Sequence, residues 1–298
     1  MTALLLLALL SAGAWAYLRW AAHEIAHGWP TWWFVAAAPL AYLAPAIILT
    51  AAGFTVAWLW RTPRPPEARL GLAGSVRLYV AETLTLAASW PCLALHRALV
   101  RDPPPQPARR AVILIHGVLV NDGMWLLFRR RLRRFGVGPV YTINYGPPLA
   151  DVESFARQLS ERIEAVCAAT GAARVVLVGH SMGGLVARAY LRRFGAERVE
   201  RLITIGTPHH GSILAWSLPG RSLAQMRPGN AWLATLNEAE GKPPPVPITC
   251  IWSRHDSMVI PQASARLAGA DEVAIVGVGH NALLNDQALV VRVVQALA

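Results

Sequence analysis

The chain has 298 residues, of which 54% are hydrophobic and 15% are charged, and its formal net charge is +11. This apolar composition excludes an intrinsically disordered chain, and three cysteines exclude a disulfide-rich secreted scaffold. Because Lys242 is the only lysine, arginine carries the positive charge, and no nucleic-acid recognition module accompanies it, so no nucleic-acid partner is expected.

Two long uncharged stretches open the chain. Residues 1–18 have no charged side chain, and residues 28–60 are likewise uncharged. Each stretch approaches or exceeds the roughly 20 apolar residues that span a bilayer. Tryptophans near both ends of the second stretch match an interfacial belt: Trp29, Trp32, Trp33, Trp58 and Trp60. Since the first stretch lacks the basic start and cleavage pattern of a signal peptide, residues 1–61 are predicted to form two transmembrane helices, a membrane hairpin.

Arginines near the helix ends predict the orientation of this hairpin. Only Arg19 lies in the expected connection, whereas four arginines follow the second helix: Arg61, Arg64, Arg69 and Arg77. The pattern predicts an integral membrane protein, with both termini and the rest of the chain on the cytoplasmic side.

The segment between the two apolar stretches contains a possible zinc motif. His23-Glu24-Ile25-Ala26-His27 matches H-E-x-x-H, which places two histidines on one helix face. A zinc site needs a third ligand, however, and Gly28-Trp29-Pro30 ends the helix at once. A polar turn between membrane helices is favoured over a zinc peptidase, and neither a metal nor a cofactor is expected.

Residues 62–108 are predicted to form an amphipathic helical segment and a linker. The stretch 70–100 is apolar but interrupted by Arg77, Glu82, His96 and Arg97, so it is expected to lie on the membrane or to cover part of the following domain. A stiff linker is predicted at residues 102–107, Asp-Pro-Pro-Pro-Gln-Pro.

The remaining residues, 109–298, alternate between strand and helix patterns. Strands are expected at 111–116, 139–144, 174–179, 201–206, 247–252 and 272–277, and the clearest helices at 151–170 and 184–194. This alternation predicts an α/β fold with a mostly parallel sheet covered on both faces.

Val178-Gly179-His180-Ser181-Met182-Gly183-Gly184 joins one of these strands to a helix. It is G-x-S-x-G in the strand–turn–helix context that exposes a nucleophilic serine. The alternative is a serine that only caps the helix. Main-chain donors for a developing oxyanion are expected from Met182 and from the loop after the first strand, at Val118 or else Leu119.

A nucleophilic serine needs a base and an acid. Where the serine lies in a strand–turn–helix of this kind, they follow it in the order Asp or Glu, then His. His280, after the strand near 272–277, is the expected base. The acid candidates are Glu238, Glu240, Asp256, Asp271 and Glu272. Asp256 is favoured because it follows the strand 247–252 at the end where the serine lies.

Two further features fall in this domain. Residues 211–246 exceed a plain connection and predict either a lid or a surface excursion. Arginines cluster on two helices, where they fit either anionic headgroups or solvated faces: Arg129, Arg130, Arg131, Arg133, Arg134, Arg188, Arg192 and Arg193.

Four motifs resemble the α/β-hydrolase superfamily, and small bacterial triacylglycerol lipases and esterases in particular. They are the His116-Gly117 loop, Gly179-His-Ser-Met-Gly-Gly, Gly206-Thr-Pro-His-His-Gly and Gly277-Val-Gly-His-Asn-Ala-Leu-Leu. The resemblance covers about residues 109–298 and carries no catalytic role for His209 or His210. It implies the α/β-hydrolase fold and Ser–Asp–His chemistry but does not specify the substrate.

The sequence therefore predicts a membrane-anchored serine hydrolase that cleaves carboxylic esters, with acyl lipids as the expected substrates. Ser181, Asp256 and His280 form its triad, and Val118 and Met182 its oxyanion hole. The same triad also serves acyltransferases and thioesterases, and a non-catalytic membrane scaffold is the alternative from another class. The sequence does not specify the oligomeric state.

Overall fold

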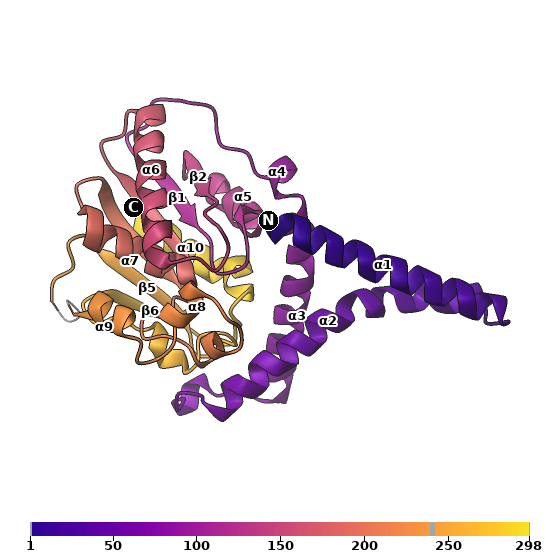
Figure 1. Cartoon of the computed structure of the whole chain (residues 1–298). Coiled ribbons are helices and arrows are strands. Elements are labelled where there is room, and N and C mark those ends of the chain that lie inside the picture. The colour runs from indigo at the N-terminus through magenta and orange to yellow at the C-terminus, as the bar shows by residue number, and fades with distance from the viewer. Residues whose placement is uncertain (1, 239–241, 298) are drawn as a thin grey trace.

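The structure is a computed structural model that describes residues 2–238 and 242–297. Six parallel strands form one sheet in the order β2-β1-β3-β4-β5-β6 (Figure 1). The strands are β1 (Ala111–Ile115), β2 (Val140–Ile143), β3 (Val175–His180), β4 (Val199–Ile205), β5 (Ile248–Ser253) and β6 (Asp271–Ile275). All five strand pairs are parallel, which confirms the predicted mostly parallel sheet.

Helices cover both faces of the sheet because side chains alternate along each strand. In β1, Ile113 packs under α6 (Val152–Thr170) and α7 (Met182–Phe194), whereas Leu114 packs under α5 (Leu126–Arg134) and α10 (Gln287–Leu297). These two cores bury the centre of the sheet, so functional side chains lie where strands end and loops begin.

Shorter elements lie in the connections. They are η1 (Pro66–Ala68), η2 (Asp122–Trp125), η3 (Ile213–Trp216), α8 (Arg221–Gln225), α9 (Ala231–Asn237), η4 (Gln262–Ala265) and η5 (Ala282–Asn285). Two of them, η4 and η5, flank the loops that follow β5 and β6.

The N-terminal hundred residues are helical and extend from one side of the sheet domain (Figure 1). They comprise α1 (Thr2–Ala26), α2 (Thr31–Leu59), α3 (Leu72–Ala94) and α4 (His96–Leu99). Near the hairpin tip α2 contacts α1, where Tyr17 Oη donates to the Phe34 carbonyl at 2.5 Å. Further along it contacts α3, where Tyr42 Oη donates to the Ala87 carbonyl at 2.8 Å. Helix α3 thus lies between the hairpin and the sheet domain.

The helix boundaries correct one expectation. Arg19 is predicted to lie in the connection between two apolar helices, but α1 continues to Ala26 and places Arg19 inside the helix. The apolar stretch ends near residue 18, but helical geometry does not, because no proline or glycine lies between residue 18 and Gly28.

Specific hydrogen bonds fasten the N-terminal segment to the sheet domain. The Thr62 amide donates to Gln262 Oε1 at 3.0 Å, and the Ala263 amide donates to Thr62 Oγ1 at 2.9 Å. Arg64 Nε donates to the Arg254 carbonyl at 2.8 Å. The chain after α2 is therefore held against the loops that follow β5.

Candidate active site

Ser181 occupies the turn between β3 and α7. Its φ of 55° and ψ of −128° place it in a strained conformation, of the kind that turns at functional sites retain. The Ser181 amide donates to the Ile205 carbonyl at 2.9 Å, which ties the turn to β4. A Cβ on Gly183 would collide with the Ile115 carbonyl, so the tight packing of α7 against β1 requires glycine there.

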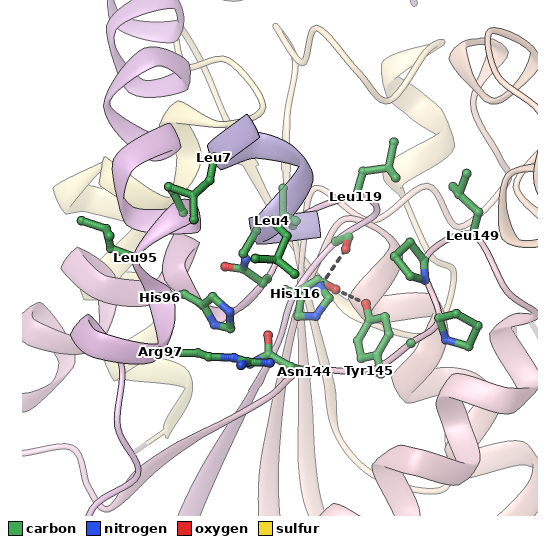
Figure 2. Close-up of a pocket in the computed structure, with 18 of the residues that line it drawn as sticks. Leu4, Leu7, Leu95, His96, Arg97, His116, Leu119, Asn144, Tyr145 and Leu149 are labelled. Atoms are coloured by element: carbon green, nitrogen blue, oxygen red, sulfur yellow. Dashed lines mark hydrogen bonds between the residues drawn. The ribbon is translucent and has the colours of Figure 1, made fainter. Parts of the chain in front are cut away.

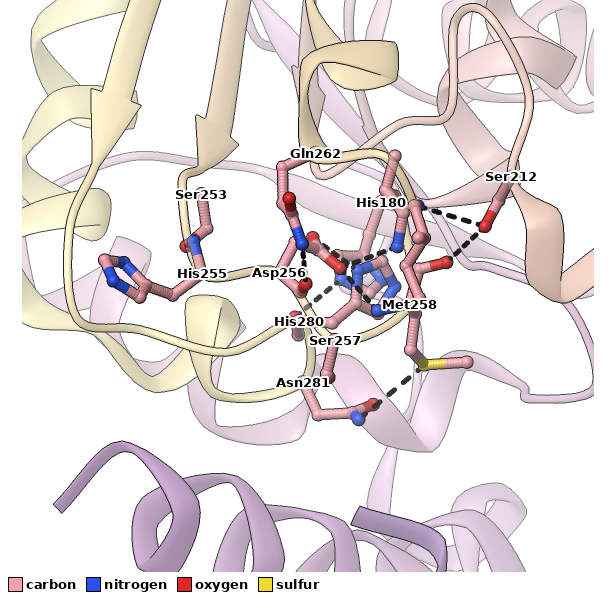
Figure 3. A network of polar contacts seen from close by, with 12 residues as sticks. His180, Ser212, Ser253, His255, Asp256, Ser257, Met258, Gln262, His280 and Asn281 are labelled. Carbon is pink, nitrogen blue, oxygen red and sulfur yellow. Dashed lines mark hydrogen bonds and ion pairs between the residues drawn. The ribbon is translucent and has the colours of Figure 1, made fainter. Parts of the chain in front are cut away.

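Asp256 and His280 meet at the carboxyl edge of the sheet, after β5 and β6 (Figure 3). His280 Nδ1 and Asp256 Oδ2 are 2.8 Å apart, and both side chains are at most 2% exposed. Asp256 Oδ1 accepts from the amides of Met258 and Val259 at 2.7 and 2.8 Å. Since Nδ1 bonds the carboxylate, Nε2 is the basic nitrogen of the neutral ring. Of the other acid candidates, Glu240 lies outside the described residues.

Opposing influences set the pKa of His280. Burial alone lowers it, whereas the charge of Asp256, its hydrogen bond and the charge of Glu82 raise it, and the balance leaves the pKa above its ordinary value. The imidazolium form of His280 is therefore stabilised, which a histidine needs if it is to accept a proton during a reaction.

His180, the residue before the serine, packs against His280. Their ring centroids are 4.6 Å apart, and His180 Nε2 lies 3.2 Å from the His280 carbonyl oxygen. Burial and the neighbouring His280 hold the pKa of His180 well below its usual range, so its ring is neutral. The Ser181 turn is thus in contact with the His280 loop. No hydrogen bond joins Ser181 Oγ to another residue in the part of the chain that the structure describes.

The loop after β1 lies directly beside the serine. A Cβ on Gly117 would be 3.0 Å from Ser181 Cβ. His116 Nδ1 contacts the Gly117 carbonyl at 2.8 Å, and its ring stacks on Tyr145, whose hydroxyl donates to the His116 carbonyl. Burial lowers the pKa of His116 to about 4, so it is a neutral residue that shapes the loop.

The two expected oxyanion donors flank this contact. Val118 follows Gly117, and Met182 is the first residue of α7, where backbone amides have no intrahelical acceptor. The structure therefore brings both segments to Ser181, while their donor role stays a prediction.

A cavity of about 480 Å³ opens beside this loop (Figure 2). Met182, Gly117 and Leu119 line it on the side of the serine, and Leu4 and Leu7 of α1 line it on the other. Its walls also include Leu95 to Ala98, Pro147, Pro148, Leu149 and Phe155. The cavity is mostly apolar and is formed jointly by the N-terminal helices and the sheet domain.

Comparisons with known proteins agree with this architecture. Residues 146–231 match a family model described as the alpha/beta hydrolase fold. The lipase BlEst2 of Bacillus licheniformis superposes with a TM-score of 0.57 at 18% identity, covering 67% of this chain and 96% of that one. Lipase B of Aspergillus fumigatus superposes with a TM-score of 0.54 at 22% identity, covering 64% and 53%. The sheet and the helices that cover it thus have the α/β-hydrolase fold, and this part of the chain is termed the hydrolase domain.

Two sequence relatives share part of this hydrolase domain. A triacylglycerol lipase of Pseudarthrobacter phenanthrenivorans is 37% identical over 115 residues, which cover 36% of this chain and 35% of that protein. A triacylglycerol lipase of Burkholderia plantarii is also 37% identical over 115 residues, 36% of this chain and 32% of that protein. The chain thus matches about a third of the length of these relatives.

The long segment within the hydrolase domain, residues 211–246, packs into the fold. Leu223, Met226, Leu233 and Leu236 are buried in the core under α6 and α7. Ser212 Oγ donates to the Met258 carbonyl at 2.6 Å, which braces the Asp256 loop. The described part of this segment supplies no residue to the cavity wall, and residues 239–241 lie outside the described residues. A lid here stays a prediction.

Part of the arginine cluster serves the hydrolase fold. Arg129 is buried and donates to the Arg101 carbonyl at 2.8 Å, and Arg192 pairs with Glu153 at 2.5 Å. Arg188 is buried beside His209, 3.2 Å from its Nδ1. These three arginines have partners within the protein.

The histidines of the zinc-like motif lie far from the hydrolase domain, at the outer end of α1. Their rings contact each other with centroids 4.2 Å apart, and the His23 side chain is 66% exposed. Across the described residues, no group of three or more His, Cys, Asp or Glu side chains is arranged to hold a metal ion.

Sequence reasoning missed Glu82, which reaches the His280 loop from α3. It is 1% exposed and accepts hydrogen bonds from Ser257 and Asn281. A signal was present, because Glu82 is the only acidic residue between Glu67 and Asp102, in a helix whose other charged residue is Arg77. A lone carboxylate there must find partners or lie at the surface.

Proposed function

We propose that this chain is a membrane-anchored serine hydrolase that cleaves carboxylic esters, acyl lipids in particular, through an acyl-Ser181 intermediate. One observation carries the proposal: the strained Ser181 turn contacts, through His180, the loop that holds the buried His280–Asp256 pair. The relatives that are named triacylglycerol lipases support the ester as the bond cleaved.

In the first half of the proposed reaction, His280 Nε2 takes the proton of Ser181 Oγ as Oγ bonds to the carbonyl carbon of the ester. This requires that substrate binding bring Nε2 and Oγ within hydrogen-bond reach, and such bonds are often long before substrate binds. His280 then gives the proton to the alkoxide oxygen as the carbon–oxygen bond breaks, which releases the alcohol and leaves the acyl-serine.

In the second half, His280 takes a proton from water, whose oxygen attacks the acyl carbon, and returns a proton to Ser181 Oγ as the carboxylic acid leaves. Asp256 orients the imidazole and stabilises its charged form in both halves. The amides of Val118 and Met182 stabilise the oxyanion, and in other enzymes the loss of one such donor costs about 3 kcal/mol.

The cavity supports an acyl-chain substrate. Its volume of about 480 Å³ suits a small ligand, and leucines from α1 and from the loop after β1 provide apolar walls. It opens beside Met182, so a chain in the cavity places its ester carbonyl near the serine turn.

The N-terminal helices support a membrane anchor. Two of them, spanning 3–26 and 31–59, are long and apolar enough to cross a bilayer by length and composition. Their tryptophans are largely exposed, and so is a stripe on α3 at four-residue spacing: Leu72, Val76, Val80 and Leu84. We propose that residues 1–61 anchor the protein in a bacterial inner membrane, that residues 62–108 connect the anchor, and that the hydrolase domain 109–298 lies on the cytoplasmic side. The exposed arginines of α5 (Arg130, Arg133 and Arg134) provide contacts to anionic headgroups.

Hydrolysis of a series of nitrophenyl esters by the full chain in detergent micelles tests the proposal. We expect turnover that depends on acyl-chain length, and a loss of at least about 10³-fold in Ser181→Ala. Equal turnover by wild type and Ser181→Ala would contradict it.

The same assay separates the alternatives. Addition of a small alcohol distinguishes an acyltransferase, which transfers the acyl group to the alcohol in preference to water, and acyl thioesters distinguish a thioesterase. Proteolysis abolished by a chelator, with ester turnover absent, would instead point to a zinc site at His23 and His27.

A further inference from the structure

The carboxylate of Glu82 is buried at the active site although it belongs to α3. Its Oε1 accepts hydrogen bonds from Ser257 Oγ at 3.1 Å, and from the Asn281 amide and Asn281 Nδ2 at 2.9 Å each. Its Oε2 accepts from the Ala282 amide at 2.9 Å. Four donors on two oxygens match the acceptor-only, ionised form of a carboxylate.

The partners of Glu82 stand next to the two catalytic candidates. Asn281 and Ala282 follow His280 directly, and Ser257 follows Asp256. A Cβ on Gly279 would lie 2.5 Å from Glu82 Oε2, so the chain just before His280 also packs against this carboxylate. Glu82 therefore fastens both loops that carry the His280–Asp256 pair.

The helix that carries Glu82 is itself held in place by the N-terminal segment. Tyr79 Oη on α3 donates to the Ile47 carbonyl of α2 at 2.8 Å. A Cβ on Gly53 of α2 would lie 3.1 Å from the Ser257 carbonyl oxygen, so α2 also approaches the Asp256 loop closely. The position of α2 and α3 thus determines where the Glu82 carboxylate lies.

We propose that Glu82 is a positioning residue for His280, and that the apolar N-terminal helices thereby complete the active site instead of serving only as an anchor. The proposal rests on the proposed ester hydrolysis. Glu82 acts through its neighbours, because its hydrogen bonds run to Ser257, Asn281 and Ala282.

Charge adds to this mechanical role. The ionisable groups that face His280 are Asp256 after β5, Glu82 from α3 and His180 at the end of β3. Burial lowers the pKa of His280, Asp256 raises it most, and Glu82 raises it further. His180, with a pKa well below its usual range, stays neutral and supplies no positive charge.

Kinetics of Glu82→Gln in the full chain test the proposal, with nitrophenyl butyrate in detergent micelles. We expect kcat to fall about 10- to 100-fold, with KM little changed, because small misplacements of reacting groups lower the rate by such factors. The acid limb, the low-pH side of the profile of kcat/KM against pH, reports the pKa of His280 in the enzyme without substrate. His280 must be neutral to act as a base. Removal of the Glu82 charge lowers that pKa, so the limb moves to lower pH.

Glu67→Gln is the matched control, because it removes an exposed carboxylate from the same segment. We expect it to leave kcat and the acid limb unchanged. Should Glu82→Gln not fold, as judged from its thermal unfolding, Glu82→Asp takes its place; it keeps the charge but withdraws the carboxylate by one methylene. Its kcat is expected to fall while the acid limb stays near that of wild type.

An unchanged kcat and acid limb in folded Glu82→Gln would overturn the proposal, and so would a lower kcat with an unmoved limb, since that marks a purely structural residue. An unchanged kcat in Glu82→Asp would overturn it as well. Failure of the proposed function looks different, because wild type would then show no turnover dependent on Ser181.

Discussion

At the residue scale, His280 lies between two carboxylates that come from different parts of the chain. Asp256 contacts its Nδ1 directly, and Glu82 binds the backbone that follows it. His180 packs on the ring as a neutral group. This environment favours the imidazolium that the proposed mechanism requires when His280 takes a proton from Ser181.

Asp256→Asn tests the direct contact. We expect kcat to fall on the order of 10⁴-fold, as replacement of the acid does in other triads, because the amide no longer holds the required tautomer. His280 is inactive when protonated, so activity is lost as pH falls through its pKa. Loss of the Asp256 charge lowers that pKa, and the acid limb of kcat/KM moves to lower pH.

The control for this substitution is Asp271→Asn, an exposed carboxylate at the start of β6. It is expected to keep wild-type kcat and an unmoved acid limb. If Asp256→Asn retains wild-type kcat, another acid orients His280.

The His280–Asp256 pair could be predicted from the sequence because each residue follows a strand. Parallel strands end at one edge of a sheet, so Ser181, Asp256 and His280 were expected at the same edge. Glu82 could not be placed this way, because its position depends on how α3 packs across a hundred residues or more of intervening chain. No strand end marks it.

At the element scale, α1 forms one wall of the cavity, where Leu4 and Leu7 face the loop after β1. If α1 is a membrane anchor, it would then also limit the length of the acyl group that fits into the cavity. The sequence predicted the apolar character of this helix but not the contact, because hydrophobic patterning does not tell a lipid-facing leucine from one that lines a pocket.

Leu7→Trp tests this role of α1. The larger side chain reduces the cavity, so we expect the preferred nitrophenyl ester to shift to shorter acyl chains while turnover of the acetate ester is retained. Leu9→Trp, on an exposed position of the same helix, should leave the preference unchanged. An unaltered chain-length profile in Leu7→Trp would show that acyl chains bind elsewhere.

At the scale of the whole molecule, the hairpin projects from one side of the hydrolase domain (Figure 1). Its inner end contributes to the cavity, and α3 reaches the His280 loop. A substrate dissolved in a bilayer would therefore meet the cavity where the hairpin joins the domain. The sheet and its helices followed from the alternating pattern, whereas the docking of the N-terminal helices follows from contacts such as Arg64 to Arg254 that no local pattern encodes.

Fractionation of cells that express the full chain with a C-terminal fluorescent protein tests the membrane arrangement. We expect the fusion to stay in the membrane pellet after an alkaline carbonate wash, because two apolar helices hold it. We also expect it to fluoresce, as a fluorescent protein on the cytoplasmic side does. Release into the supernatant would contradict the anchor, and a dark, membrane-bound fusion would contradict the orientation.

The proposed reaction requires that Ser181 be an activated nucleophile. Peptide mapping by mass spectrometry, after the full chain reacts with a fluorophosphonate probe, tests this requirement. We predict a phosphonate adduct on the peptide that contains Ser181, and none in a folded Ser181→Ala variant. Folded wild-type protein that stays unlabelled, or an adduct that persists in Ser181→Ala, would show that Ser181 is not the nucleophile.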